Sequence, residues 1–389
     1  MTAKRRVALL GSTGSIGTQA LQVIALHPER FDVAALTAHG NRDLLFEQVR
    51  RFRPAFAALT AGETEIPEDL RFCEWGFGED ALVTAARDVP CDDVLVAVVG
   101  MAGLPSVLAA RESGRRVLLA NKEALVAGGG LVMDLCPPDE ANPSLIPVDS
   151  EHSAVFQCLR AAGTPYESIT LTASGGPFRT WDAQQLATAT LEDALRHPTW
   201  NMGRKITVDS ATMFNKALEI IEAKWLFRAE PGQIDVLIHP ESVIHSMVHF
   251  RDGATLAQMG VPDMRTPIAY ALGFPGRPES GAGALRLGAM GTLRFEEPDP
   301  VRFPALRLAY EALAAGGTAC CVLNAANEEA AGAFLGGSLR YAGVAAVVEE
   351  TLGRVPSMKA DSLENILRAD TIARQAARRL IKEGFPRKR

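Results

Sequence analysis

The sequence has few cysteines for its length, and none stands at a metal-binding spacing. Its six cysteines are scattered over 389 residues without a CxxC pair, and the adjacent Cys320 and Cys321 cannot readily bridge each other. A zinc site or a disulfide framework is recognised by regular cysteine spacing. We therefore expect reduced thiols in a cytoplasmic protein.

Long apolar runs and an excess of positive charge are also absent. No apolar run reaches the ~18 residues needed to span a bilayer. The basic start, "MTAKRRVALLGSTG", has only "VALL" as its apolar part, too little for a signal peptide. The net charge is −6, and the basic cluster "FPRKR" is most simply a solvated tail. We expect neither a nucleic-acid partner nor a membrane partner.

The first 149 residues predict an α/β fold with a Rossmann-type parallel sheet. Apolar runs alternate with helix-like stretches such as "GTQALQVIALHPERF" and "NRDLLFEQVRRF". Strands that are apolar on both faces and separated by helices form buried parallel sheets. The expected strands are "RRVALLG", "FDVAALTA", "FAALTA", "DDVLVAVVG", "RRVLLANK" and "SLIPVD".

The rest of the chain predicts two further domains, as expected for a chain too long for one core. Residues 150–162 and 211–228 have a helical pattern, whereas "SITLTAS" and "DVLIHPESVIHSMVHF" resemble strands. A Gly/Pro-rich stretch, "GFPGRPESGAGALRLGAMG", reads as a linker before an alanine-rich helical pattern. We expect a dinucleotide domain over 1–149, an α+β catalytic domain over 150–285, a linker at 286–299 and a C-terminal helical bundle over 300–389.

A glycine-rich turn after the first strand indicates a nucleotide site. In "VALLGSTGSIGTQALQVI", Gly11, Gly14 and Gly17 are spaced GxxGxxG, which is weak evidence alone and stronger in a βαβ context. Glycines let the backbone approach a pyrophosphate, which the helix N-terminus attracts. The alternative is a turn that merely tightens a strand–helix corner.

The end of the second strand favours NADP(H). NAD sites usually carry an acid here for the ribose 2′-hydroxyl, but this sequence reads His39, Gly40, Asn41 and Arg42. Asp43 comes late enough to be an ordinary N-terminal helix residue. Asn41 and Arg42 can bind a 2′-phosphate that a carboxylate would repel. A solvated loop charge at Arg42 is the alternative.

Two carboxylates, Asp149 and Glu151, follow a predicted strand at the end where α/β sheets bind ligands. Capping of the next helix is the alternative. In "DSATMFNKALEIIEAKWLF", Asn215, Glu219 and Glu222 share a helix face, which is either part of a site or a solvated face. Asp149, Glu151 and Glu219 would make an all-oxygen set suited to Mg²⁺ or Mn²⁺.

Other polar segments look suited to an anion. "TASGGPFR" offers the Ser174 hydroxyl and backbone N–H groups after a strand, although Gly-Gly is more often a turn. Ser210 and Lys216 add a donor and a cation. Trp200, in the loop "HPTWNMGRKITV", either belongs to a lid that excludes water or pins the loop to the core. The histidines of "LIHPESVIHSMVHF" lack a zinc spacing and fit structural positions better than ligation.

Long blocks of the sequence resemble the 1-deoxy-D-xylulose 5-phosphate reductoisomerase family. The blocks run in order from residue 7 to beyond 330: "GSTGSIG", "LLANKEALV", "VDSEHSAVFQCL", "TASGGPFR", "HPTWNMGRKITVDSATMFNKALEIIEAKWLF", "LIHPESVIHSMVHF", "PDMRTPIAYAL" and "VLNAANEEA". The resemblance implies a homodimeric cytoplasmic enzyme of the non-mevalonate isoprenoid pathway. It would isomerise 1-deoxy-D-xylulose 5-phosphate and reduce the product with NADPH to 2-C-methyl-D-erythritol 4-phosphate, using one divalent cation (Mg²⁺, Mn²⁺ or Co²⁺).

The same resemblance implies roles for single residues. The metal ligands would be Asp149, Glu151 and Glu219. The substrate contacts would be Ser150, Glu151, Ser174, His197, Ser210, Asn215, Lys216 and Glu219. The catalytic group would include Lys216, Glu222, His197 and the flap residue Trp200, with His245 in support. The cofactor contacts would be Gly11, Ser12, Thr13, Gly14, Ser15, Ile16, His39, Gly40, Asn41, Asn121, Lys122, Glu123 and Gly203.

One departure concerns the 2′-phosphate. Many family members have Gly-Lys-Asn where this chain has His39, Gly40 and Asn41, so Arg42 or His39 would replace the missing lysine. The general acid/base stays open between Lys216, Glu222 and a metal-bound water.

Two other functions stay open at this point. A dehydrogenase of the aspartate-semialdehyde type needs a nucleophilic cysteine, which the polar motifs lack, and a sugar-phosphate dehydrogenase without rearrangement has no evident need for three acids. A non-catalytic NADP-sensing protein would bind the cofactor without consuming it. NADPH absorbance with deoxyxylulose phosphate, with and without metal, separates the three.

Overall fold

The computed structural model describes residues 4–139, 141–200 and 202–385, so the basic residues 386–389 lie outside the described part. The chain divides into two compact units, each built from several chain segments. The first unit comprises Met1–Ala124, Val132–Ser153 and Asp263–Gly283. The second comprises Leu125–Leu131, Ala154–Pro262 and Ala284–Arg389. The domain boundaries expected from the sequence stay a prediction.

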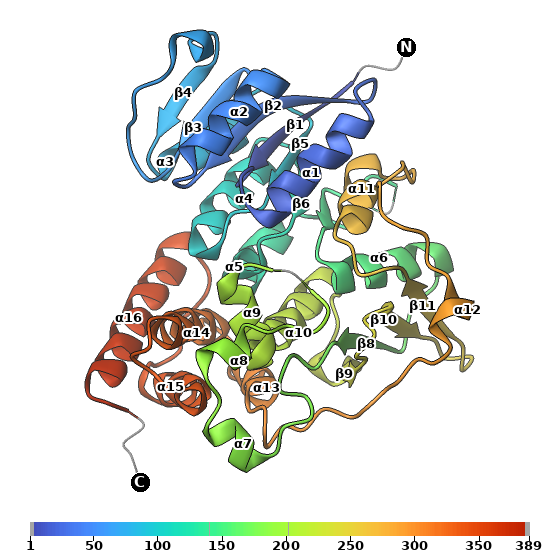
Figure 1. The fold of residues 1–389 in the computed structure, drawn as a ribbon, viewed down its shortest axis with the longest axis vertical. Helices are drawn as coiled ribbons and strands as arrows, with labels where there is room; N and C mark the ends of the chain where they lie inside the picture. The colour runs from blue at the N-terminus through green and yellow to red at the C-terminus, as the bar shows by residue number, and fades with distance from the viewer. Residues whose placement is uncertain (1–3, 140, 201, 386–389) are drawn as a thin grey trace. The chain divides into compact units, whose positions relative to one another are not determined.

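The first unit contains a parallel sheet with helices around it (Figure 1). Its strands are β1 (Arg5–Leu10), β2 (Phe31–Ala38), β3 (Phe56–Leu59), β4 (Glu74–Phe77), β5 (Asp93–Val96), β6 (Arg116–Leu119) and β7 (Leu145–Pro147). Over the described residues these seven strands have the order β4-β3-β2-β1-β5-β6-β7, with parallel pairing throughout. The Rossmann-type sheet expected from the sequence is confirmed.

Helices of the first unit cover both faces of this sheet. They are α1 (Ser15–Leu26), α2 (Arg42–Phe52), η1 (Glu68–Leu70), α3 (Asp80–Arg87), η2 (Gly100–Ala102), α4 (Gly103–Glu112), the ends of α5 (Lys122–Asp134), the start of α6 (Ser150–Ala162), and α11 (Arg265–Gly273). Because parallel crossovers are right-handed, α1 and α2 lie on one face and α3 and α4 on the other. The late helix α11 packs against α1.

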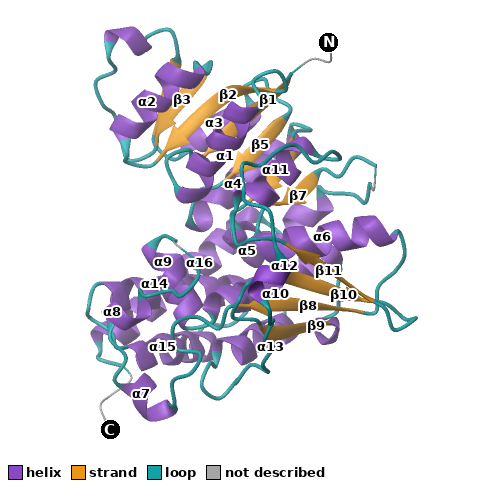
Figure 2. Cartoon of the chain, turned by 45° about the vertical axis from the view of Figure 1, so that its right-hand side comes forward, coloured by secondary structure: helices purple, strands orange, loops and turns teal. Residues whose placement is uncertain are grey.

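The second unit combines a mixed sheet with a group of C-terminal helices (Figure 2). The strands are β8 (Ser168–Ala173), β9 (Ile234–Ile238), β10 (Ile244–His249) and β11 (Thr255–Met259), in the order β11-β10-β8-β9. Strands β8 and β9 are parallel, whereas β10 is antiparallel to β8 and β11. The α+β character and the helical C-terminal region are thereby confirmed.

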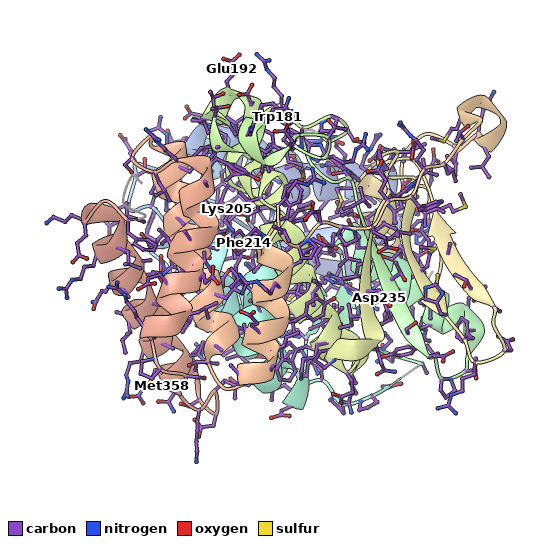
Figure 3. The ribbon with its side chains drawn as sticks, turned by 90° about the horizontal axis from the view of Figure 1, so that it is seen from below. Trp181, Glu192, Lys205, Phe214, Asp235 and Met358 are labelled. Carbon is purple, nitrogen blue, oxygen red and sulfur yellow. The ribbon has the colours of Figure 1, made fainter. Side chains whose placement is uncertain are left out.

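Helix α10 (Phe214–Phe227) packs against β8, β9 and α13 (Ala305–Ala315). Helix α14 (Ala319–Leu335) packs against α15 (Tyr341–Arg354), α16 (Leu363–Lys382) and α9 (Arg204–Ala211). Figure 3 draws the side chains, with Lys205 marking α9 and Phe214 the start of α10. The remaining helices are α7 (Ala183–Ala187), α8 (Leu191–Ala194), η3 (Pro231–Gln233) and α12 (Leu287–Met290).

Two runs that the sequence predicts as single elements are each divided. The expected helix 211–228 begins with the last residue of α9, is interrupted at Thr212 and Met213, and continues as α10. Met213 has a φ of 62°, which interrupts the right-handed helix. The expected strand 235–250 forms β9 and β10, with a turn at Pro240 and Glu241 between them. Proline cannot donate a ladder hydrogen bond, which explains the break.

Among the described helices, none combines the length and the apolar character needed to cross a membrane. All six cysteines are free and buried, as expected for reduced thiols. Burial raises the pKa of Cys73 to about 12, so this thiol stays protonated near neutral pH.

Candidate functional site

The turn after β1 requires glycine at two positions. Gly11 has a φ of 87°, and a Cβ there would lie 2.7 Å from the Ala97 carbonyl oxygen. A Cβ on Gly17 would lie 2.3 Å from the Gly11 carbonyl oxygen. Gly14 is the N-cap of α1 and supplies no capping side chain. This tight turn before an uncapped helix N-terminus is an arrangement that suits an anion such as a pyrophosphate.

The other residues of this turn differ in exposure. Ser12 is buried, and its Oγ donates to Gln48 Oε1 at 2.7 Å. Its N–H donates to the Thr37 carbonyl oxygen at 2.7 Å, so the Ser12 side chain shapes the turn from within. The rest of the predicted loop is more accessible, with Thr13 and Ile16 half-buried and Ser15 exposed. The support from Gln48 was not predicted from the sequence.

A cavity of about 340 Å³ lies beyond the carboxyl end of β2. One wall is formed by residues 39–43, of which the sequence predicts 39–42 to meet the 2′-phosphate. The other wall follows β3 and includes Ala61, Gly62, Glu63 and Thr64, which the sequence analysis missed. Because β2 and β3 are parallel neighbours, the loops after them meet at one edge of the sheet.

Polar groups in this cavity are already oriented. His39 Nδ1 lies 2.9 Å from Thr60 Oγ1. Asn41 accepts from the Leu44 N–H at 3.4 Å and caps α2, so its carbonyl oxygen has a structural contact. Arg42 is half exposed and lies beside Asp43, with 3.0 Å between Nε and Oδ1. Asp43 stands in the first turn of α2, as expected.

The start of α5 is held by Asn121. Its Oδ1 accepts from the Ala124 N–H at 3.0 Å and caps the helix, while its Nδ2 donates to Glu123 Oε2 at 2.8 Å. A Cβ on Gly103 would lie 2.2 Å from Asn121 Oδ1, so glycine is needed there. The neighbouring Lys122 pairs with Asp149. The three residues 121–123 are all buried.

Asp149 and Glu151 lie where β7 leads into α6. Asp149 Oδ1 lies 3.4 Å from the His152 N–H nitrogen, so the capping contact considered from the sequence is present. Its other oxygen, Oδ2, pairs with Lys122. Ser150 Oγ donates to Glu151 Oε2. The contact from the His152 N–H is long and therefore weak, so capping does not exclude ligation at Asp149.

Helix α10 buries Lys216, Glu219 and Glu222, which excludes the solvated face considered from the sequence. Lys216, Glu219 and Glu222 are 3%, 0% and 3% exposed. Asn215 Nδ2 donates to Glu219 Oε1 at 2.6 Å, and Lys216 pairs with Oε2. A buried carboxylate is costly unless it is charge-paired and hydrogen-bonded, and Glu219 has both.

The loop after β8 lies against α9. Gly175 and Gly176 have φ values of 82° and 65°, and a Cβ on Gly176 would lie 2.7 Å from the Ser210 carbonyl oxygen. The Gly176 N–H donates to Ser174 Oγ at 3.2 Å. Helix α9 starts after Gly203, which gives no side-chain cap. The second unit thus brings the Ser174 loop and the Ser210 helix into contact.

His197 connects this loop to the segment that carries Trp200. Its Nε2 lies 3.0 Å from Ser174 Oγ, and its Nδ1 accepts from the Trp200 N–H at 2.9 Å. Burial lowers the pKa of His197 to about 4, which keeps the ring neutral near pH 7. The Trp200 and His245 rings lie 6.5 Å apart.

The other histidines of the β9–β10 segment have structural contacts. His239 is fully buried, and its ring stacks on Phe295 with centroids 4.8 Å apart. His249 lies between two hydroxyls, with Nε2 at 2.7 Å from Thr170 Oγ1 and Nδ1 at 2.8 Å from Thr255 Oγ1. These contacts agree with the structural roles expected from the sequence.

Asp209, the residue before Ser210, has buried polar contacts that the sequence did not predict. Asp209 Oδ2 pairs with Lys205 Nζ at 2.6 Å, and Asp209 Oδ1 accepts from Asn327 Nδ2 at 3.0 Å. Asn327 belongs to the block "VLNAANEEA" on α14. The sequence does show Asp209 directly before the candidate contact Ser210. It does not show the partner, because Asn327 lies more than a hundred residues further along the chain.

Family models match most of the chain. The model described as 1-deoxy-D-xylulose 5-phosphate reductoisomerase matches residues 7–129. The one described as 1-deoxy-D-xylulose 5-phosphate reductoisomerase C-terminal domain matches 145–227. The one described as DXP reductoisomerase C-terminal domain matches 259–376.

Whole proteins of this kind are also similar to the chain. The 1-deoxy-D-xylulose 5-phosphate reductoisomerase of Paraburkholderia xenovorans is 51% identical over 387 residues, covering 97% of this chain and 96% of the relative. The solved enzyme from Zymomonas mobilis in complex with NADPH is 43% identical with a TM-score of 0.89, covering 98% of this chain and 100% of that one. A DOX-P reductoisomerase in complex with NADPH, fosmidomycin and magnesium is 37% identical with a TM-score of 0.90, covering 99% and 100%.

Proposed function

The chain belongs to the 1-deoxy-D-xylulose 5-phosphate reductoisomerase family, and from this premise we propose how its own residues serve the reaction. The protein is an NADPH- and divalent-metal-dependent oxidoreductase of isoprenoid synthesis. It isomerises 1-deoxy-D-xylulose 5-phosphate and reduces the product to 2-C-methyl-D-erythritol 4-phosphate. The observation that carries this conclusion is the 51% identity over 97% of the chain, with the site motifs in order.

We assign the divalent cation to Asp149, Glu151 and Glu219. These side chains offer only carboxylate oxygens, the ligands that hard divalent cations prefer. The bound ion supplies electrostatic stabilisation to oxygens of the sugar that gain negative charge during rearrangement. Lys122 pairs with Asp149 and Lys216 pairs with Glu219, so each of these two carboxylates has a cation beside it.

We propose that hydrogen-bond donors in the loop after β8, in α9 and in α10 bind the substrate phosphate. Ser174 and Ser210 supply hydroxyls, Asn215 an amide and Lys216 a positive charge, while Ser150 adds a hydroxyl at the start of α6. Holding the phosphate away from the reacting carbons orients the sugar, so remote binding energy serves the chemistry. For proton transfer we propose Lys216 and Glu222, two of the buried ionisable groups of α10.

We propose that the cofactor binds at the glycine turn and in the cavity beyond β2. Residues 11–16 would hold the pyrophosphate, and His39, Gly40, Asn41 and Arg42 would meet the ribose 2′-phosphate. Asn121, Lys122, Glu123 and Gly203 would meet the nicotinamide side. Bound NADPH supplies the hydride. Closure of the Trp200 loop over the substrate would exclude water from that transfer.

We further propose a homodimer in the cytoplasm. Strand β11 stands at the edge of its sheet, and Thr255–Ala257 are exposed. Among these residues, the large apolar Leu256 is 39% exposed. Natural proteins cover such edges, and a two-fold axis lets the same edge of a second copy extend the sheet. Six buried, free cysteines support a reducing compartment.

Glu219→Gln tests the reaction and its metal dependence together. The amide keeps the shape but loses the charge that a cation needs, so we expect turnover at limiting Mg²⁺ to fall by about 100-fold or more. NADPH oxidation in the presence of 1-deoxy-D-xylulose 5-phosphate is followed by absorbance. Glu192→Gln, at an exposed acid on α8, is the matched control and keeps full activity.

Three results bear on the assignment. Wild-type turnover that stops when the metal is chelated and returns with Mg²⁺ supports it. Full activity of Glu219→Gln at limiting Mg²⁺ rejects the ligand role. NADPH binding without any consumption in the presence of substrate and metal would instead favour the sensing protein.

A further inference from the structure

One imidazole ring joins the loop of Trp200 to the hydroxyl of Ser174. His197 Nδ1 lies 3.1 Å from the Thr199 N–H nitrogen and 2.9 Å from the Trp200 N–H nitrogen. On the opposite side of the ring, Nε2 lies 3.0 Å from Ser174 Oγ. All of these contacts lie within the second unit.

The two backbone N–H groups decide which ring nitrogen carries the proton. A backbone N–H can only donate, so a ring nitrogen that faces two of them acts as an acceptor. Nδ1 therefore has no proton, and a neutral imidazole then carries its proton on Nε2. It follows that Nε2–H donates to Ser174 Oγ. The depressed pKa of His197, caused by burial, agrees with a neutral ring.

This tautomer determines what the Ser174 hydroxyl can do. Ser174 Oγ accepts from His197 Nε2–H and from the Gly176 N–H at 3.2 Å. A hydroxyl has two acceptor positions and one proton. With both acceptor positions occupied, Ser174 is left to donate its proton to an acceptor such as a phosphate oxygen.

We propose that His197 is a positioning residue that couples the order of the Trp200 loop to the donor role of Ser174. Nδ1 holds the backbone of the loop, and Nε2–H fixes the direction of the Ser174 hydroxyl. The proposal rests on the proposed function and deepens it, since it links phosphate recognition and loop closure through one side chain. His197 acts here through Ser174 and the loop, without a proton transfer to the substrate.

Two amide variants separate the two ends of the ring. In His197→Asn the side-chain oxygen takes the place of Nδ1, so the loop contact survives and the Ser174 contact is lost. In His197→Gln the longer side chain brings its amide to the place of Nε2, so the Ser174 contact survives and the loop contact is lost. Ser174→Ala serves as the reference for loss of the hydroxyl.

The first measurement of the test is hydrogen exchange at the Thr199 and Trp200 amides in the substrate-free full chain. The second is steady-state kinetics, which gives KM and kcat with 1-deoxy-D-xylulose 5-phosphate. His197→Asn is expected to exchange like the wild type and to raise KM about tenfold, the scale of one hydrogen bond to a charged group. His197→Gln is expected to exchange at least about tenfold faster at both amides. It should lower kcat more than it raises KM. The double variant His197→Asn/Ser174→Ala should raise KM no more than Ser174→Ala alone.

The proposal is overturned if the two amide variants behave alike in exchange and kinetics, or if His197→Gln leaves both amides as protected as in the wild type. Additive KM effects in the double variant also overturn it. The exchange measurement needs neither substrate nor turnover. If the wild type failed to oxidise NADPH with the sugar phosphate, the proposed function would fail while the exchange comparison still judged the role of His197.

Discussion

At the residue scale, Arg42 shows what the sequence reveals about the cofactor and what it conceals. The missing acid and the cation at 42 are visible in the sequence, because the end of the second strand is recognisable. The role of Glu63 is not visible in the sequence, because Glu63 follows a different strand. It lines the same cavity only because β2 pairs with β3. Such non-local neighbours explain why one wall of the cavity was predicted and the other was missed.

Arg42→Ala should narrow the preference for NADPH. If the guanidinium holds the 2′-phosphate, the Kd for NADPH rises about tenfold, the effect of one charge-assisted contact, and the Kd for NADH stays unchanged. Glu63→Gln should act in the opposite direction, because it removes a carboxylate from the same cavity. Fluorescence titration of the substrate-free protein measures both. Equal weakening of the two cofactors by Arg42→Ala would assign the 2′-phosphate to another residue, with His39 the next to test.

His197 also gives a prediction about pH. Burial lowers its pKa from 6.5 to about 4. Between these values the unfolded chain binds a proton that the folded chain rejects, so the free energy of unfolding falls as the pH falls through this window. Above it, the ring is neutral in both states and has no effect. His197→Asn should therefore flatten the pH dependence between about pH 6.5 and about pH 4, measured by urea unfolding. Parallel curves for the two proteins would contradict the neutral ring.

At the element scale, the recognisable strands were those buried on both faces. Residues 7–10 of β1 are fully buried and form an unbroken apolar run, as the sequence indicated. Strand β4, with the sequence EWGF, is a partly exposed edge strand without such a run, and the sequence did not predict it. The break before α10 was also missed, because nothing in the local pattern marks Met213 for a φ of 62°.

Gly176 and Gly163 form a matched pair for testing the turn after β8. Both have positive φ, at 65° and 61°. A Cβ on Gly176 would lie 2.7 Å from the Ser210 carbonyl oxygen, whereas a Cβ on Gly163 would meet nothing within 4 Å. Gly163→Ala should cost about 1 kcal/mol of stability through backbone strain alone. Gly176→Ala should cost roughly 2–4 kcal/mol, because the clash adds to that strain. Urea unfolding compares them, and equal losses would mean that the loop and α9 yield easily.

At the scale of the whole molecule, the proposed dimer gives the remaining prediction. Lysine on an exposed edge opposes pairing with another strand, so Leu256→Lys should shift the sedimentation mass from dimer toward monomer. Val301→Lys, at an 86% exposed residue outside the sheet, should leave the mass unchanged. A monomeric wild type, or a Leu256→Lys variant that stays fully dimeric, would argue against the β11 edge as the interface.

The segmental construction of the first unit has a consequence for biosynthesis. Helix α11 packs against α1, and His27 Nε2 lies 2.7 Å from the carbonyl oxygen of Glu279. Partners separated by some 250 positions in the chain cannot meet until the later one has left the ribosome. While more than a hundred residues of the other unit are translated, the nascent Rossmann-type sheet therefore lacks α11. During that time the surface of α1 that later contacts α11 is exposed to solvent. Recombinant fragments that end near residue 150 would keep that flank bare and are expected to precipitate.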